Sequence, residues 1–165
     1  MFRSKLFAAL TVALSVFGIT MLDCAVAGEK SKWHGTSVAT KWHQLEVGDE
    51  EGHVIAIYEA KQVYFNENTG EKMVSITNNT MDFNLKTGQG TVKGYGMSTF
   101  PNGDKTFRMH EGKPVGKGHW KGTHSYIKGT GKYEGIKGGG TWDTYSLAEG
   151  VSYIEVESEI ELPAQ

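Results

Sequence analysis

The chain has 165 residues, of which 17 are basic and 19 are acidic, for a formal net charge of −2. Its lysines are scattered among glycines and acidic residues, and this pattern excludes the basic stripe of a nucleic-acid-binding protein. The length suits one domain with a sizeable core. The single cysteine, Cys24, lies in the N-terminal apolar segment, so the sequence predicts no disulfide.

The N-terminus has the pattern of an export signal. Arg3 and Lys5 precede an apolar run over residues 6–22, and the small-residue sequence Ala25-Val26-Ala27 follows. This order predicts a secretory signal peptide over residues 1–27 and a periplasmic or secreted mature protein with no membrane span. The apolar run also approaches transmembrane length, so a retained N-terminal anchor is the alternative.

The rest of the chain is typical of strands. Glycine supplies 22 residues, and no long segment repeats apolar residues at helical spacing. The turn Pro101-Asn102-Gly103-Asp104 predicts a hairpin, because Asn-Gly accepts positive φ at both central positions. In chain order the predicted strands are Trp33 to Val47, His53 to Phe65, Lys72 to Leu85, Gly90 to Phe100, Asp104 to Glu111, Lys117 to Ile127, Gly138 to Leu147 and Val151 to Glu161.

These strands predict an all-β protein: a single eight-stranded antiparallel up-and-down barrel, calycin-like, over residues 28–165. Between Lys117 and Ile127, large and small residues alternate on one face, as they do inside a small barrel, so this face is expected to point inward. In the last strand the glutamates from Glu155 to Glu161 alternate with apolar residues such as Ile154, which places the acids in water. Closure also removes the exposed edges of an open sheet.

The segment from Gly129 to Gly140 is the most glycine-rich part of the chain. A phosphate-binding loop is excluded, because no Lys-Ser or Lys-Thr pair follows the glycines and Thr141-Trp142-Asp143 resumes a strand where a helix would have to start. The segment is interpreted as the corner that brings the penultimate strand into the barrel wall.

Three features taken in order resemble a known family. They are Gly94-Tyr95-Gly96 with the Asn-Gly hairpin after it, the sequence Gly129-Thr130-Gly131-Lys132-Tyr133-Glu134-Gly135, and the closing strand around Ile154 to Leu162. Together they resemble bacterial proteins with an allene-oxide-cyclase-like barrel, distant relatives of plant dirigent proteins, over roughly Gly52 to the C-terminus. The resemblance implies a barrel with a central apolar cavity, self-association into a homo-oligomer, and relatives that cyclise or orient small hydrophobic molecules. It assigns no catalytic residue.

The candidate site residues are the aromatic and titratable side chains expected to face the cavity. The predicted ligand-binding residues are Tyr58, Trp120, His124, Tyr126 and Trp142, and the catalytic candidates are His124 and Tyr126. Arg108 and His110 share one strand face and would form a cationic spot for a carboxylate or enolate if they pointed inward. The outward orientation is favoured, because charged residues are seldom buried without partners.

No metal or cofactor is predicted. The chain has six histidines without the paired spacing of a metal site, and His119 and His124, five residues apart, belong on opposite faces of a regular strand. A Lys-Trp-His triplet occurs at residues 32–34 and again at 41–43. We interpret it as a coincidence on an exposed first strand.

Two functions are compatible with these features. The first is an exported barrel that binds a small hydrophobic or aromatic molecule in its central cavity, which requires only a cavity. The alternative is an isomerase or cyclase of the allene oxide cyclase or dirigent type, which also requires an inward titratable group. A structural envelope protein would instead have a filled barrel.

Overall fold

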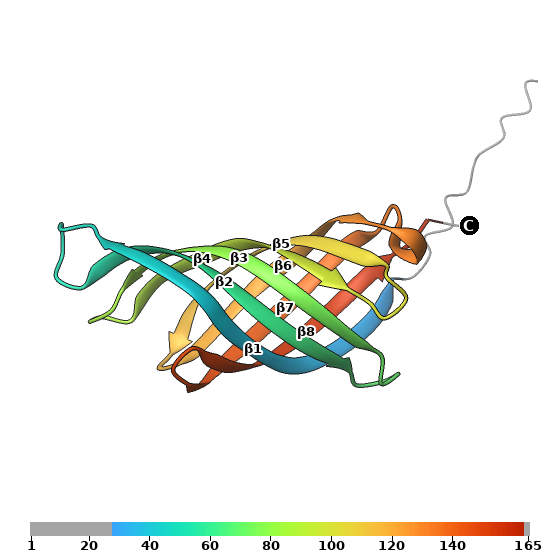
Figure 1. Ribbon diagram of the computed structural model, residues 1–165, viewed down its shortest axis with the longest axis horizontal. Coiled ribbons are helices and arrows are strands. Elements are labelled where there is room, and N and C mark those ends of the chain that lie inside the picture. The colour runs from blue at the N-terminus through green and yellow to red at the C-terminus, as the bar shows by residue number, and fades with distance from the viewer. Residues whose placement is uncertain (1–27, 164–165) are drawn as a thin grey trace, which may run out of the picture.

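The structure, a computed structural model, describes residues 28–163, so the predicted signal peptide lies outside the described residues. Eight strands form one closed barrel in which each strand is antiparallel to its neighbours and the last pairs with the first (Figure 1). The predicted all-β, eight-stranded up-and-down barrel is confirmed. The strands are β1 (Glu29–Glu46), β2 (His53–Asn66), β3 (Lys72–Asn84), β4 (Gln89–Thr99), β5 (Lys105–Gly116), β6 (His119–Gly129), β7 (Lys137–Ala148) and β8 (Val151–Glu161).

The expected alternation of faces holds in the last strand. Ile154 and Ser158 of β8 are buried, whereas the alternate residues Glu155, Glu157 and Glu159 are exposed on the outer wall. Within residues 28–163, no helix is long and apolar enough to span a membrane.

One end of the barrel is closed by packed side chains. We call this group the closed-end cluster; it comprises Trp33, Tyr64, Met73, Phe100, Tyr133, Ile136 and Ile154. The ring of Phe100 lies 4.5 Å from that of Tyr133 and 6.2 Å from that of Trp33, measured between centroids. Such aromatic pairs add to the stabilisation from burial of apolar area. The barrel is therefore not an open tube.

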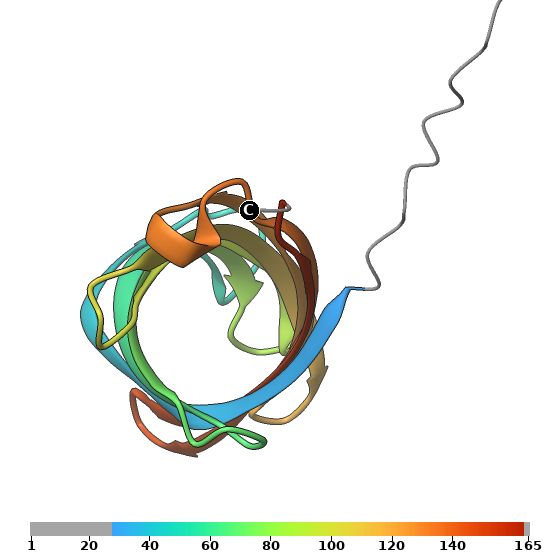
Figure 2. The same ribbon diagram turned by 90° about the vertical axis from the view of Figure 1, so that its right-hand side faces the viewer.

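The glycine-rich segment contributes to this closure in a way that the strand pattern did not predict. It contains a single turn of 3-10 helix, η1 (Gly131–Tyr133), which lies at the rim of the barrel end that faces the viewer in Figure 2. Asp104 in the β4–β5 turn accepts a hydrogen bond from the backbone N–H of Lys132 at 3.2 Å. Gly131 has a φ of +56°, and a side chain there would collide with Asp104. This tight turn carries the buried Tyr133 into the closed-end cluster.

A β-bulge in β1 gives both tryptophans of the repeated Lys-Trp-His triplet an inward orientation. Ala39 pairs with Ala60, and the next pair is Lys41 with Glu59, so Thr40 is an extra residue. Nine residues would place Trp33 and Trp42 on opposite faces of a regular strand. Because of the bulge, both indoles point inward, Trp33 into the closed-end cluster and Trp42 into the lumen. The expectation of an exposed strand fails at Trp33, which is buried, and holds for the second triplet, whose residues 41–43 are exposed.

Removal of the Tyr133 side chain should destabilise the barrel. Tyr133 is only 7% exposed and packs within the closed-end cluster. We expect Tyr133→Ala to lower the free energy of unfolding by about 3 kcal/mol, the usual cost of deleting a buried aromatic ring. Tyr95→Ala is the matched control, because Tyr95 is 61% exposed on the outer wall of β4, and it should cost about 0.5 kcal/mol or less. Urea denaturation measures both, and equal losses would contradict the role of the cluster.

Candidate functional site

The barrel contains a cavity of about 310 Å³ between the closed-end cluster and the opposite barrel end. The inward residues of β7, β8 and the middle of β1 are small there, which leaves the space unfilled. These small lining residues are Ser37, Ala39, Thr144, Ser146, Ala148 and Ser152. Trp42, which is 43% exposed, marks the end of the cavity that faces solvent.

Large aromatic side chains line the cavity near this solvent-facing end. The rings of Trp42 and Tyr58, which are paired across β1 and β2, lie 5.1 Å apart. Trp120 of β6 also lines the cavity, and its ring lies 5.2 Å from that of Phe83. Burial raises the pKa of Tyr58 to about 12, so its hydroxyl stays protonated. These rings offer a planar apolar molecule faces against which to stack.

Trp142 lies against the wall at a place where two neighbouring strands carry glycine. A side chain at Gly112 of β5 or at Gly122 of β6 would collide with the indole ring of Trp142. The indole N–H of Trp142 donates to the carbonyl of Thr123 at 3.2 Å. Two glycines and one hydrogen bond therefore hold the ring in one orientation beside the cavity.

The polar part of the cavity lies deeper and centres on Arg108 of β5. Its guanidinium donates to the Ser98 hydroxyl at 2.7 Å, to the Ser75 hydroxyl at 3.3 Å and to the Gln62 side-chain carbonyl at 3.4 Å. The side chain crosses the neighbouring strand at Gly96, where a Cβ would lie 3.0 Å from the guanidinium carbon. These contacts explain why a cation can point inward, and the expectation that Arg108 and His110 point outward is wrong.

His110 lies one inward position nearer the solvent-facing end than Arg108. Its Nε2 lies 2.7 Å from the side-chain carbonyl oxygen of Asn79, whose amide nitrogen donates to Thr77 and to the backbone carbonyl of Tyr58. Nε2 must therefore carry the proton, which leaves Nδ1 with a free lone pair. Nδ1 is buried and has no partner within residues 28–163. Burial, with the charge of Arg108 adding to it, lowers the pKa of His110 to about 4, so the ring is neutral at pH 7.

His124 and Tyr126 of β6 meet at a third side chain. The hydroxyl of Ser158 lies 3.1 Å from Nε2 of His124 and 3.3 Å from the hydroxyl of Tyr126. Burial is the main cause that lowers the pKa of His124 to about 4, and the charge of Arg108 adds to it. His124 faces the cavity, whereas Tyr126 packs against the closed-end cluster.

Four of the five residues predicted to bind ligand border the cavity: Tyr58, Trp120, His124 and Trp142. Tyr126 does not border it, but its ring lies 5.4 Å from that of His124, which does. Sequence reasoning missed most of the other lining residues, among them the large or polar side chains of Trp42, Gln62, Tyr64 and Asn79. The repeated triplet was the available signal for Trp42. Placement alone assigns none of these residues a role in binding or catalysis.

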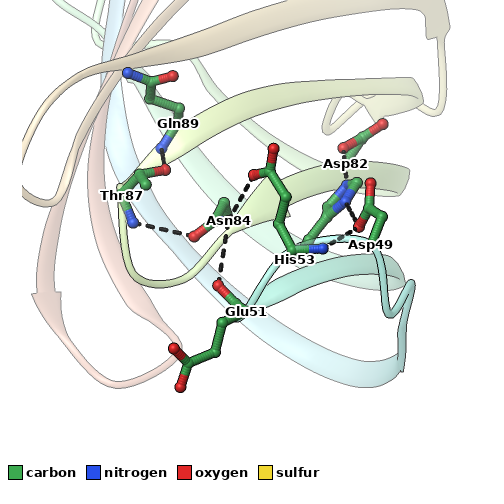
Figure 3. A network of polar contacts seen from close by, with 8 residues as sticks. Asp49, Glu51, His53, Asp82, Asn84, Thr87 and Gln89 are labelled. Carbon is green, nitrogen blue, oxygen red and sulfur yellow. Dashed lines mark hydrogen bonds and ion pairs between the residues drawn. The ribbon is translucent and has the colours of Figure 1, made fainter.

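The other histidines lie outside the lumen. His53 bridges two carboxylates, with Nδ1 2.6 Å from Asp49 and Nε2 2.9 Å from Asp82 (Figure 3). Hydrogen bonds to Asp82 and Asp49 raise its pKa, so the imidazolium links the β1–β2 loop to β3. His119 pairs with Asp143 at 2.7 Å on the outer wall. Within residues 28–163, no group of three or more histidine, cysteine or acidic side chains is arranged to hold a metal ion.

Comparison with known proteins places the fold among solved barrels. No protein-family model matches the chain, and no curated protein matches it by sequence. The solved structure of the pterocarpan synthase dirigent protein GePTS1 is similar, with a TM-score of 0.52, 9% identity, and coverage of 98% of this chain and 100% of that one. The pterocarpan synthase dirigent protein PsPTS1 has a TM-score of 0.51, 8% identity, and coverage of 84% and 99%. The chain shares the barrel fold of dirigent proteins.

The buried neutral histidines should make the protein less stable in acid. The pKa of His124 is about 4 in the folded chain, against an ordinary value of 6.5. Between these values the unfolded chain binds a proton that the folded chain does not. The free energy of unfolding therefore falls as the pH drops from about 6.5 to 4, by up to about 1.4 kcal/mol per pH unit for each such histidine.

Urea denaturation at pH 7.5, 6 and 5 measures this slope. His124→Gln should flatten it relative to the wild type, and His43→Gln, which changes an exposed histidine, should leave it unchanged. The raised pKa of His53 has the opposite sign: it stabilises the fold at low pH and loses that effect as the pH rises. All the proteins compared contain His53, so its contribution cancels. A slope in His124→Gln equal to that of the wild type would contradict the prediction.

Proposed function

We propose that this chain is an exported barrel protein that binds a small hydrophobic or aromatic molecule in its central cavity. The observation that supports this most is the combination of about 310 Å³ of unfilled space with five tryptophan and tyrosine side chains along it. Ligand sites generally occupy several hundred cubic ångströms and combine apolar walls with a few polar groups. A barrel that served only a structural role would bury this surface by filling its interior.

The fold comparison is consistent with this proposal. The similar solved structures are described as pterocarpan synthase dirigent proteins, so a barrel of this shape is associated with an activity in those proteins. At 9% and 8% identity this supports the fold alone and not their reaction. The relation to allene oxide cyclases and to a bacterial family remains a prediction from the sequence motifs.

Export and self-association are also proposals. The motif over residues 1–27 supports delivery to the periplasm or the cell exterior, and fractionation of the source cells tests it. Exposed apolar side chains on the outer wall support a homo-oligomer, because a second copy would cover them. They include Val63, Val74, Met109 and Ile127. Sedimentation of the purified chain measures its oligomeric state, and a monomer at all concentrations would contradict this proposal.

The alternative function is an isomerase or cyclase, and the free Nδ1 of His110 is the observation that favours it. A neutral imidazole beside Arg108 has the arrangement needed to remove a proton next to a carbonyl, with the guanidinium stabilising the enolate. A pKa of about 4 makes His110 a weak base at neutral pH, however, and this favours binding as the main function.

Binding should depend on the aromatic lining. We expect 2-naphthylmethanol, a neutral two-ring probe, to quench the tryptophan fluorescence of the wild type on titration. Trp120→Ala should weaken its binding by about tenfold through loss of one stacking face. The exposed Tyr95→Ala is the matched control and should bind the probe as the wild type does. If both variants bind the probe with equal affinity, the probe does not bind against Trp120 in this cavity.

The alternative is tested by proton exchange on a bound ketone. In heavy water, His110 would take a proton from the carbon next to the carbonyl of 2-tetralone, and a deuteron would return to the enolate. Under the enzyme hypothesis, the wild type accelerates deuterium incorporation, measured by mass spectrometry, and His110→Phe does not. His43→Phe, which changes an exposed histidine, is the control. Equal rates in the wild type and in His110→Phe would remove His110 from any mechanism of this kind.

A further inference from the structure

Arg108 is a cation inside the barrel with neutral partners. Its three hydrogen bonds go to two hydroxyls and one amide carbonyl, from Ser98, Ser75 and Gln62. A guanidinium has five N–H donors, so two have no acceptor within the described chain. Its guanidinium carbon lies 6.0 Å from the centre of the Tyr64 ring, which adds a cation–π contact but no negative charge.

No carboxylate neutralises this charge. Eleven ion pairs occur among residues 28–163, and none includes Arg108. The cations of these pairs are lysines and histidines, and the only other arginine of the chain, Arg3, lies outside the described residues. Charges withdrawn from water are normally paired, because an unpaired one loses its hydration without compensation. The inner part of the cavity therefore has an unbalanced positive charge.

The groups that surround Arg108 favour the binding of an anion in this part of the cavity. The hydroxyl of Tyr64 is buried and has no partner within residues 28–163. Burial raises the pKa of Tyr64, so this hydroxyl stays protonated and can donate. His110 and His124 are neutral at pH 7 and do not add positive charge. Among the described residues that line the cavity, Arg108 is the only charged one.

The polar and the aromatic part of the cavity are reached from two positions of the same strand, β5. Arg108 pairs with Gly96, and Gly112, against which the Trp142 ring lies, is four residues further along β5. Four residues of strand span about 13 Å. This is the scale of a one- or two-ring molecule that carries a short acidic group.

We propose that the ligand is a small aromatic carboxylate, which binds with its carboxylate against Arg108 and its ring among Trp42, Tyr58, Trp120 and Trp142. The carboxylate would accept a hydrogen bond from an unused N–H group of Arg108, and a bond between two charged groups is stronger than the neutral ones that Arg108 makes now. This inference rests on the proposed binding function and specifies the class of its ligand. It also accounts for the inward orientation of Arg108, which packing alone does not explain.

The test compares two probes that share a naphthalene ring and differ in charge: 2-naphthoate and 2-naphthylmethanol. Isothermal titration calorimetry at pH 7.5 should show that the wild type binds the acid at least about tenfold more tightly than the alcohol. Arg108→Met should abolish this preference and leave the affinity for the alcohol within about threefold. Lys128→Met removes the same charge from the exposed outer wall of β6 and should keep the preference.

Each contrary result has a distinct meaning. If the wild type binds neither probe, the proposed binding function is overturned, and this inference falls with it. If it binds both equally, the binding function stands and the preference for an acid is overturned. A preference that survives in Arg108→Met, or that Lys128→Met removes equally, shows that Arg108 does not contact the carboxylate and overturns its role. The wild-type comparison requires no variant, so it decides the ligand class even if Arg108→Met does not fold.

Discussion

Closure of the eight-stranded sheet sets the width of the lumen, and every second residue of each strand must point into it. The free volume inside the barrel then depends on the size of these inward side chains at each level along the barrel axis. Aromatic and aliphatic side chains fill one end, where η1 adds Tyr133. Small residues such as Ala39 and Ser152 face the lumen in the other half. The cavity therefore exists because many large inward side chains gather at one end of the barrel and small ones line the other half.

Closure of the sheet also places polar side chains in the interior of the barrel. An arginine that points into a closed lumen cannot extend its side chain to bulk solvent as a surface arginine does, so Arg108 depends on Ser98, Ser75 and Gln62 from three other strands. Burial of the rings, with the charge of Arg108 adding to it, lowers the pKa of His110 and of His124. Arg108 thus joins three strands by hydrogen bonds and adds to the effect of burial on the two histidines.

The glycines of β4 show how closely backbone and site are linked. Gly94 and Gly96 both point inward, and a Cβ on Gly94 would lie 2.8 Å from Nε2 of His110. The absence of side chains there lets His110 reach Asn79 and lets Arg108 cross the strand. These two glycines belong to the Gly-Tyr-Gly sequence that carried part of the family resemblance. In this chain their physical role is to make room for the polar groups of the cavity.

Much of the fold could be predicted because strands are local. Alternation, Asn-Gly and the glycine-rich turns located all eight strands, and the small and large residues of β6 correctly placed Trp120 and His124 inside. The orientation of Trp42 was not predicted, because the extra residue Thr40 turns the strand so that Trp42 lies on its inner face. It also failed for Arg108, because a strand with a polar face allows either orientation until its partners are known.

The amino-acid sequence by itself determined the number and order of the strands and the faces of β6 and β8, since these follow from periodicity and turn chemistry within a few residues. The tertiary structure alone decided which side chains share the cavity. Arg108 and Gln62 are 46 residues apart in the chain, and Ser158 joins His124 across 34 residues. Such contacts depend on the register of all the intervening strands and on their bulges. The same register decides that no acid of the described chain lies beside Arg108, because the absence of a counterion is a property of the surroundings and not of the residue.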